Sequence, residues 1–151
     1  MIPAWVQKTK ADKGPAAVRL FLGLIFVMTG AMKLVVPMLA DAWSGQLLAA
    51  GLPFHELTRW TVPFLEMGVG VMLLLGLFAR LAGVIVIGIM TVATYVHLAV
   101  DDPSLFPLQP SEPIVPVAMM GAAAYVVWRG AGQWSHDLKS THRNGLTEED
   151  S

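Results

Sequence analysis

Long apolar runs with almost no charged side chains constrain this chain more than any other feature. The run 81–100 contains no Asp, Glu, Lys or Arg, and the runs 16–36, 60–78 and 113–128 are also strongly apolar. A helix needs about 20 mainly apolar residues to cross a hydrocarbon core about 30 Å thick. Alternation with a period of two is missing, so we expect helices rather than strands. The sequence therefore predicts an all-α membrane protein with a four-transmembrane-helix bundle.

The composition narrows the class further. Apolar residues make up 55% of the chain and charged residues 14%, whereas a soluble domain carries about 25% charged residues. The formal net charge of −1 gives no basic surplus for nucleic acid, so the expected partner is the lipid bilayer. The chain has no cysteine, which excludes a disulfide framework, a thiolate metal site and thiol exchange by its own residues.

The charges outside the runs predict an orientation. Basic residues gather before and at the start of the first run, at the turn between the second and third runs, and after the last run: Lys8, Lys10, Lys13, Arg19, Arg80, Arg129, Lys139 and Arg143. Acidic residues gather in the two remaining connections, where Arg59 is the one basic residue: Asp41, Glu56, Asp101, Asp102 and Glu112. Positive charge stays on the cytoplasmic side, so we expect a multi-pass protein of a bacterial-type cytoplasmic (inner) membrane with both termini cytoplasmic. In this orientation Trp43 and Trp60 belong to an outer aromatic belt.

The domain organisation follows from these runs. We expect a cytoplasmic N-terminal arm at 1–15, a four-helix membrane domain at 16–129 and a polar, loosely ordered cytoplasmic tail at 130–151. An alternative is that the first run is a cleaved signal peptide, since Thr29-Gly30-Ala31 has the form of a cleavage site. Against this, the apolar character resumes after Lys33.

Two connections have patterns of their own. Between residues 37 and 59 the apolar residues follow a helical spacing, interrupted by Ser44-Gly45, which predicts an outer amphipathic or re-entrant segment between the first two spans. Residues 101–116 contain five prolines, which predicts an extended outer cover. Glycines recur along the spans and are expected to let helices approach closely: Gly23, Gly30, Gly68, Gly70, Gly76, Gly83, Gly88 and Gly121.

Three ionisable side chains lie within the apolar runs, namely Lys33, Glu66 and His97. At about 1.5 Å of rise per residue, Lys33 and Glu66 each lie about 9 Å below the outer boundary of the membrane, and His97 lies about 4 Å below it. Intramembrane ionisable groups are functional candidates by default. We therefore predict one polar pocket near the outer face, with His55, Arg59 and Asp101 at its rim.

The sequence is compatible with more than one role for these three residues. Lys33 and Glu66 form either a structural ion pair or a ligand- or proton-handling site, or else Lys33 extends to the lipid head groups and Glu66 takes up a proton. His97 alone does not supply two haem ligands and is compatible with a hydrogen-bonded interfacial histidine. No motif for a metal site, an intrinsic cofactor or a catalytic centre is present, so whether the chain is an enzyme is left open.

The order of these residues resembles the DoxX family of small four-helix membrane proteins. The first span carries Arg19, Gly23, Phe26, Gly30 and Lys33; Gly51-Leu52-Pro53 follows; the second span carries Glu66, Gly70, Leu73, Gly76 and Arg80; and His97 ends the third. The resemblance covers residues 19–97 and implies a polar signature of Arg19, Lys33, Glu66, Arg80 and His97.

What the resemblance implies is a subunit or accessory protein of a membrane redox system, linked to quinone or to sulfur and thiol chemistry. Without cysteine or a flavin motif, the chain would need a partner oxidoreductase subunit, and a quinone headgroup or a small oxyanion would bind in the polar pocket. Two other classes stay open: a small transporter, and a structural or assembly subunit. A homo-oligomer is compatible with all three.

Overall fold

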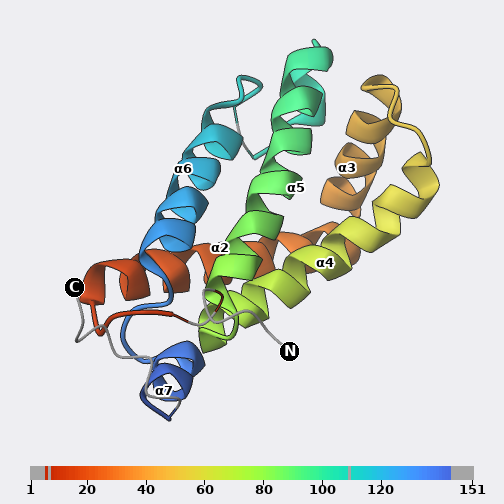
Figure 1. Cartoon of the computed structure of the whole chain (residues 1–151). Helices are drawn as coiled ribbons and strands as arrows, with labels where there is room; N and C mark the ends of the chain where they lie inside the picture. The colour runs from red at the N-terminus through yellow and green to blue at the C-terminus, as the bar shows by residue number, and fades with distance from the viewer. Residues whose placement is uncertain (1–5, 7, 109, 144–151) are drawn as a thin grey trace.

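Helices and the loops that connect them make up the part of the chain that the computed structural model describes, residues 6, 8–108 and 110–143. The ends of the predicted arm and tail lie outside these residues. The elements, in chain order, are α2 (Lys13–Val35), α3 (Pro37–Ala49), α4 (His55–Leu75), α5 (Ala79–Ala99), the short 3₁₀ helix η1 (Pro103–Leu105), α6 (Ile114–Arg129) and α7 (His136–Arg143). The described residues contain no strand (Figure 1), which confirms the predicted all-α class.

Three of the four predicted spans have helices of spanning length. By length and composition, α2, α4 and α5 are long and apolar enough to cross a membrane. Helix α6 is apolar but has 16 residues, which corresponds to about 24 Å and is shorter than a hydrocarbon core of about 30 Å. Pro113 precedes its first residue, and Gly130, with φ of 85°, follows its last. The structure thus has three candidate spans and a shorter apolar helix.

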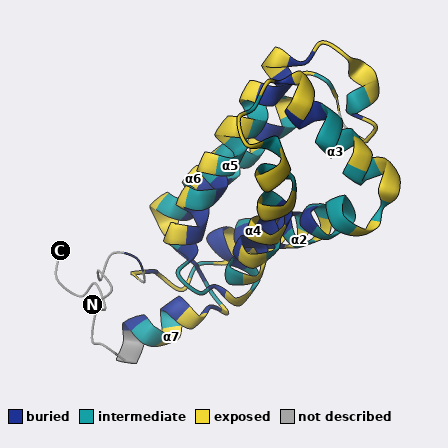
Figure 2. Cartoon of the chain, turned by 90° about the vertical axis from the view of Figure 1, so that its right-hand side faces the viewer, coloured by how far each residue is buried: buried dark blue, intermediate teal, exposed yellow. Residues whose placement is uncertain are grey.

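The outward faces of the long helices are apolar, as lipid contact requires. On α2, the side chains of Phe21, Leu24 and Met28 are all more than half exposed, and their spacing of three and four residues places them on one face. Figure 2 shows exposed positions along the outer sides of the helices. Such a surface would be a large apolar patch in water, so its distribution supports a membrane protein.

Close contact between α2 and α4 depends on glycine. A Cβ added at Gly70 would lie 2.7 Å from the Val27 backbone N and 2.8 Å from the Gly23 backbone O, and one at Gly30 would lie 2.7 Å from the Pro63 backbone O. The absence of these side chains lets the two backbones approach. The prediction that glycines let the helices approach closely is therefore confirmed for Gly23, Gly30 and Gly70.

Other glycines in the spans do not share this role. A Cβ added at Gly68, Gly88 or Gly121 would meet no atom within 4 Å. The prediction that these three positions bring helices together is therefore wrong, because each faces open space rather than a neighbouring backbone.

The main core lies near the turn between α4 and α5. Its buried residues come from α2, α4, α5, α6 and the segment after α6: Leu22, Phe26, Val69, Leu73, Ala79, Ala82, Val86, Ala123, Val126 and Ala131. Beyond this core, α4 and α5 diverge from their connecting turn, and α3 stands beside both of them (Figure 1). Lys33 of α2 and Glu66 of α4 meet beyond this core, beside α3.

Helix α3 is continuous, contrary to the predicted interruption at Ser44-Gly45. It starts at Pro37, one residue after the extended Val36, and runs to Ala49. A Cβ at Gly45 would lie 2.8 Å from the Leu105 side chain, so the glycine provides room for the loop between α5 and α6, which contains η1, instead of breaking the helix. The Gln46 side-chain amide donates to the Leu105 backbone O, which fixes the loop on α3.

The segment 130–143 is folded against the bundle, so the expectation of a loosely ordered tail is wrong for these residues. The buried Arg19 side chain of α2 donates to the backbone oxygens of five residues: Leu73, Leu74, Ala131, Gln133 and Trp134. Gly76 adopts φ of 62°, and a Cβ there would lie 2.8 Å from the Ser135 Cα. The hydrogen bonds of Arg19 therefore hold the tail near the end of α4, and Gly76 allows its close approach.

The buried Asp137 of α7 provides the second anchor of the tail. Its carboxylate accepts hydrogen bonds from the backbone N–H groups of Phe78 and Ala79, each at 2.8 Å. These N–H groups lie at the start of α5, where a helix has no internal acceptors for them. A residue of the tail therefore caps the third candidate span.

Asp137→Asn is expected to remove a pH dependence of stability. Burial raises the pKa of the Asp137 carboxyl above 3.8, while hydrogen bonds from Ala79 and Phe78 and the charge of Arg19 act in the opposite direction. A raised folded-state pKa stabilises the fold fully below the unfolded value of 3.8, and this contribution is lost as the pH rises through the folded-state pKa. Thermal unfolding in detergent from about pH 4 to about pH 7 should show the wild type losing stability relative to the variant. A difference that does not change with pH would contradict this.

Candidate functional site

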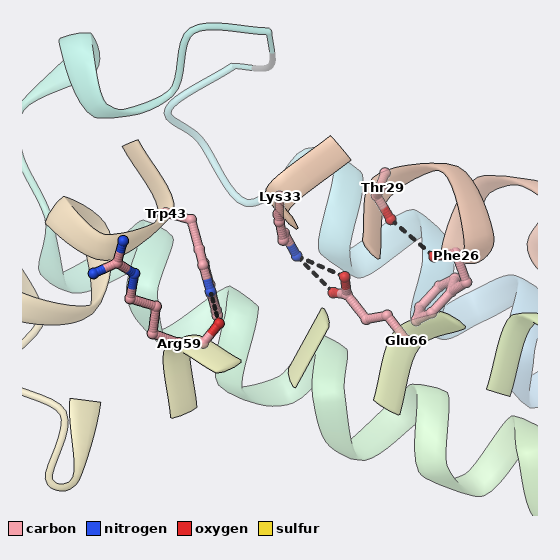
Figure 3. Close-up of polar contacts among 6 residues, drawn as sticks. All are labelled: Phe26, Thr29, Lys33, Trp43, Arg59 and Glu66. Atoms are coloured by element: carbon pink, nitrogen blue, oxygen red, sulfur yellow. Dashed lines mark hydrogen bonds and ion pairs between the residues drawn. The ribbon is translucent and has the colours of Figure 1, made fainter. Parts of the chain in front are cut away.

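Lys33 and Glu66 form an ion pair inside the bundle. Lys33 Nζ, in the last turn of α2, donates to both carboxylate oxygens of Glu66 on α4, at 2.7 and 2.8 Å (Figure 3). The Glu66 side chain is 3% exposed and that of Lys33 is 22% exposed. The alternative in which Lys33 extends alone to the lipid head groups is therefore wrong, since its ammonium turns inward to the carboxylate.

Trp43 of α3 covers the ion pair. Lys33 Nζ lies 4.5 Å from the centre of the Trp43 ring, a distance typical of a cation–π contact. The indole Nε1 donates to the Arg59 backbone O at 3.3 Å (Figure 3). Pro63 lies four residues further along α4 and has no N–H, so it leaves this carbonyl without its helical donor. Because Pro63 has no N–H, the Arg59 oxygen is free to accept the hydrogen bond that orients Trp43.

Trp43 is a site residue that the sequence assigns only to an aromatic belt. A proline inside a span was the available signal, because it indicates a free carbonyl four residues earlier. It does not indicate which side chain uses that carbonyl.

A first cavity of about 320 Å³ lies on one side of the ion pair. Its polar lining consists of Thr29, Lys33, Trp43, Gln46 and Glu66, from α2, α3 and α4. Methionine, valine, leucine and proline side chains of α5, α6 and the preceding loop form the opposite wall. Ligand pockets in proteins are mostly apolar with a few converging polar groups and span about 300–1,000 Å³, so this cavity has both the size and the lining of one.

A second cavity of about 510 Å³ adjoins the same ion pair. Lys33, Trp43 and Glu66 line both cavities, while the remaining walls of the second one come from α4, α5 and the segment before α4. Apart from these three residues and Thr58, its lining is apolar. The ion pair thus lines both cavities; besides the three shared residues, the first cavity has two polar side chains, Thr29 and Gln46, and the second has one, Thr58.

His97 lies apart from the ion pair, in a separate cluster with the proline-rich loop. Its Nδ1 is 2.8 Å from the Ser111 backbone O, and its ring centre is 4.4 Å from that of the buried Phe106. His97 lines neither of the two cavities. The structure therefore brings Lys33 and Glu66 together, whereas His97, the third predicted pocket residue, contacts the proline-rich loop and fixes it against α5.

The proline-rich loop is less extended than expected. It contains the 3₁₀ helix η1, and Asp102 caps this helix by accepting from the Ser104 backbone N–H at 2.9 Å. Phe106, just after η1, is buried with Val96, Val100 and Ala50. Burial of an aromatic side chain against α5, together with the His97 contact, explains why the segment turns back onto the bundle.

The predicted rim residues do not converge on the ion pair. His55 Nε2 lies 3.5 Å from a carboxylate oxygen of the neighbouring Glu56. The Arg59 guanidinium lies 5.4 Å from the centre of the Trp60 ring, and Asp101 is exposed. Among these three, only Arg59 contributes to the site, and it does so through its backbone oxygen.

The chemistry of the site follows from these groups. Lys33 is a hydrogen-bond donor, and Glu66 is a proton donor or acceptor of a kind that general acid–base chemistry uses. No group of three or more His, Asp or Glu side chains that could hold a metal ion occurs in the part of the chain that the structure describes. The site is therefore suited to a molecule with an oxygen-bearing polar head and apolar surface.

The comparison with known proteins identifies one family. The DoxX family model matches residues 14–99, more than half of the chain, from α2 to the end of α5. This segment contains both partners of the ion pair and confirms the resemblance found over residues 19–97. No curated protein and no solved structure matches the chain.

Proposed function

The chain belongs to the DoxX family, and we propose that it serves a membrane redox system as a subunit or accessory protein that binds a quinone headgroup beside the Lys33–Glu66 pair. The observation that carries this proposal is a buried ion pair in the wall of a mostly apolar cavity. Charged groups inside membrane proteins are costly and mark sites for ligands, ions or protons. Because the chain has no cysteine, a partner oxidoreductase subunit would supply the electrons.

The residues of the cavity have distinct tasks in this proposal. Lys33 donates a hydrogen bond to a carbonyl oxygen of the headgroup, and Glu66 gives or takes a proton at that oxygen. Gln46 and Thr29 are further polar groups of the lining. Met90 and Met119 contact the apolar edge of the ring, because flexible thioether side chains adapt to ligands of irregular shape.

We further propose that the protein has four spans in a bacterial-type inner membrane, with both termini cytoplasmic. The basic residues support this, because Arg80 is the second residue of α5, next to the turn that follows α4, and Arg129 is the last residue of α6. Helix α6 crosses as a short span where the bilayer thins around it. In this orientation the ion pair lies toward the outer face, at the opposite end of the helices from Arg19 and the tail.

Two measurements on the Glu66→Gln variant test the quinone proposal. Lipid extraction from wild-type protein purified in mild detergent should yield quinone, and the variant should retain about tenfold less, because it leaves Lys33 without its charged partner. Glu56→Gln is the matched control: it makes the same change at an exposed residue of α4 and should retain quinone. Absence of quinone from the wild type, with unchanged quinone-linked activity in Glu66→Gln membranes, would refute the proposal.

A structural role for the pair is the second candidate. In the part of the chain that the structure describes, every buried side-chain nitrogen and oxygen has a hydrogen-bond partner, so the pair is complete without a ligand. Transport has less support: substrate sites of transporters lie on broken helices, whereas α4 continues from His55 to Leu75 with Pro63 inside it. Flux into proteoliposomes that Glu66→Gln abolishes would favour transport.

A further inference from the structure

The second cavity has the character of a site for a hydrocarbon chain. We propose that it holds the tail of the molecule whose polar head contacts Lys33 and Glu66. The ligand is then a tailed membrane lipid such as a prenylated quinone, and not a small water-soluble oxyanion. This inference rests on the proposed function and narrows the class of ligand, because a headgroup site alone could bind either a tailed lipid or a small oxyanion.

The lining of the two cavities supports this division between head and tail. Gln46 and Thr29 line only the first cavity, together with the shared Lys33, Trp43 and Glu66. In the second cavity, Thr58 is the one polar side chain besides those three. A single molecule in the second cavity therefore meets Lys33 and Glu66 at one end and apolar side chains of α4 and α5 at the other. A small oxyanion would leave the larger cavity without a matching occupant.

The lining of the second cavity also includes exposed apolar side chains of two candidate spans. Leu65 of α4 and Val92 of α5 line it, and they are 45% and 46% exposed. These helices are candidate spans and diverge from their shared turn (Figure 1). A tail seated between them can continue into the surrounding lipid, which gives a lipid-soluble ligand a lateral route to the ion pair.

Gly88 offers a specific way to close this route. It lies on α5 in the lining of the second cavity, and a Cβ at this position would meet no atom within 4 Å. A side chain introduced at position 88 therefore begins in open space, and a phenylalanine there would occupy part of the cavity. Gly121 of α6 is a matched control, since it is equally open but lines neither cavity.

The experiment measures binding of two benzoquinones that share one ring, one with a decyl tail and one without a tail, to purified protein in detergent. Wild type and Gly121→Phe should bind the tailed compound about tenfold more tightly than the tail-free one. Gly88→Phe should bind the tail-free compound as the wild type does and lose the advantage of the tail. The melting temperature shows whether Gly88→Phe impairs folding. If it does, Gly88→Leu is used in its place.

The outcomes separate this inference from the proposed function. Equal binding of both compounds by the wild type would overturn the tail site and leave the quinone proposal intact. A Gly88→Phe variant that still binds the tailed compound more tightly than the tail-free one would also overturn the tail site. That result is expected if a bulk lipid chain, or nothing, occupies the cavity. Equal weakening of both compounds by Gly88→Phe also overturns it. Failure of the wild type to bind either compound would refute the quinone proposal and this inference with it.

Discussion

Arg19→Met is expected to prevent stable folding, with a loss of at least about 5 kcal/mol. Hydrogen bonds from a charged donor contribute about 1.5–3 kcal/mol each, and the fully buried Arg19 side chain donates to five backbone oxygens. Methionine fills a similar volume but donates nothing, so all five hydrogen bonds are lost, although the Leu73 oxygen keeps the bond from the Gly76 backbone N–H. A loss of this size is comparable with the whole stability of many proteins, about 5–15 kcal/mol.

The measurement is the yield and thermal unfolding of monodisperse protein in detergent. Arg19→Lys should be intermediate, because one ammonium group has three donors and lacks the planar fork of a guanidinium. Arg80→Met is the matched control: the Arg80 side chain is partly exposed and donates through Nε to the Lys8 backbone O. Its effect should stay below about 1 kcal/mol. An Arg19→Met protein that melts within a few degrees of the wild type would contradict the prediction.

Arg19 also shows where the sequence was informative and where it was not. An arginine in an apolar run indicates a helix end or a buried partner, and the family signature includes this residue. Its partners, however, are backbone oxygens of the segment 131–134 and of the end of α4. Any residue type has a backbone oxygen, so neither the composition nor the spacing of the tail predicts that it is anchored there.

The sequence predicts how deep the site residues lie along their helices, but not toward which neighbouring helix their side chains point. Counting residues from the helix ends placed Lys33 and Glu66 at one level, because the rise per residue in a helix is constant, and the structure joins them. The same count put His97 near that level, yet its ring turns to Phe106 and the loop. Depth along an axis does not specify which face of a helix meets which neighbour, and that depends on the packing of all the helices together.

The Lys33–Glu66 pair is expected to show strong coupling in a double-mutant cycle. Removing one partner of a buried ion pair costs about 3–5 kcal/mol, because the other charge stays buried without compensation, whereas replacing both partners by apolar residues is often neutral. Lys33→Met and Glu66→Leu alone should therefore each destabilise the protein by about 3 kcal/mol, and the double variant should unfold near the wild-type temperature. The measurement is thermal unfolding of the four proteins in one detergent. Additive effects of the two substitutions would show that the pair contributes no coupling.

The folded double variant then separates the two candidate roles of the pair, because it keeps the packing and removes the chemistry. If the pair only fixes α2 against α4, the double variant should retain assembly and activity as well as stability. If the pair is the headgroup site, the same protein should fold normally and bind the tail-free benzoquinone at least about tenfold more weakly, because the donor Lys33 and the acid Glu66 are both gone. Normal folding with unchanged quinone binding would refute the site. Normal folding with lost binding cannot arise from a purely structural pair, since the structure it was held to maintain is still present.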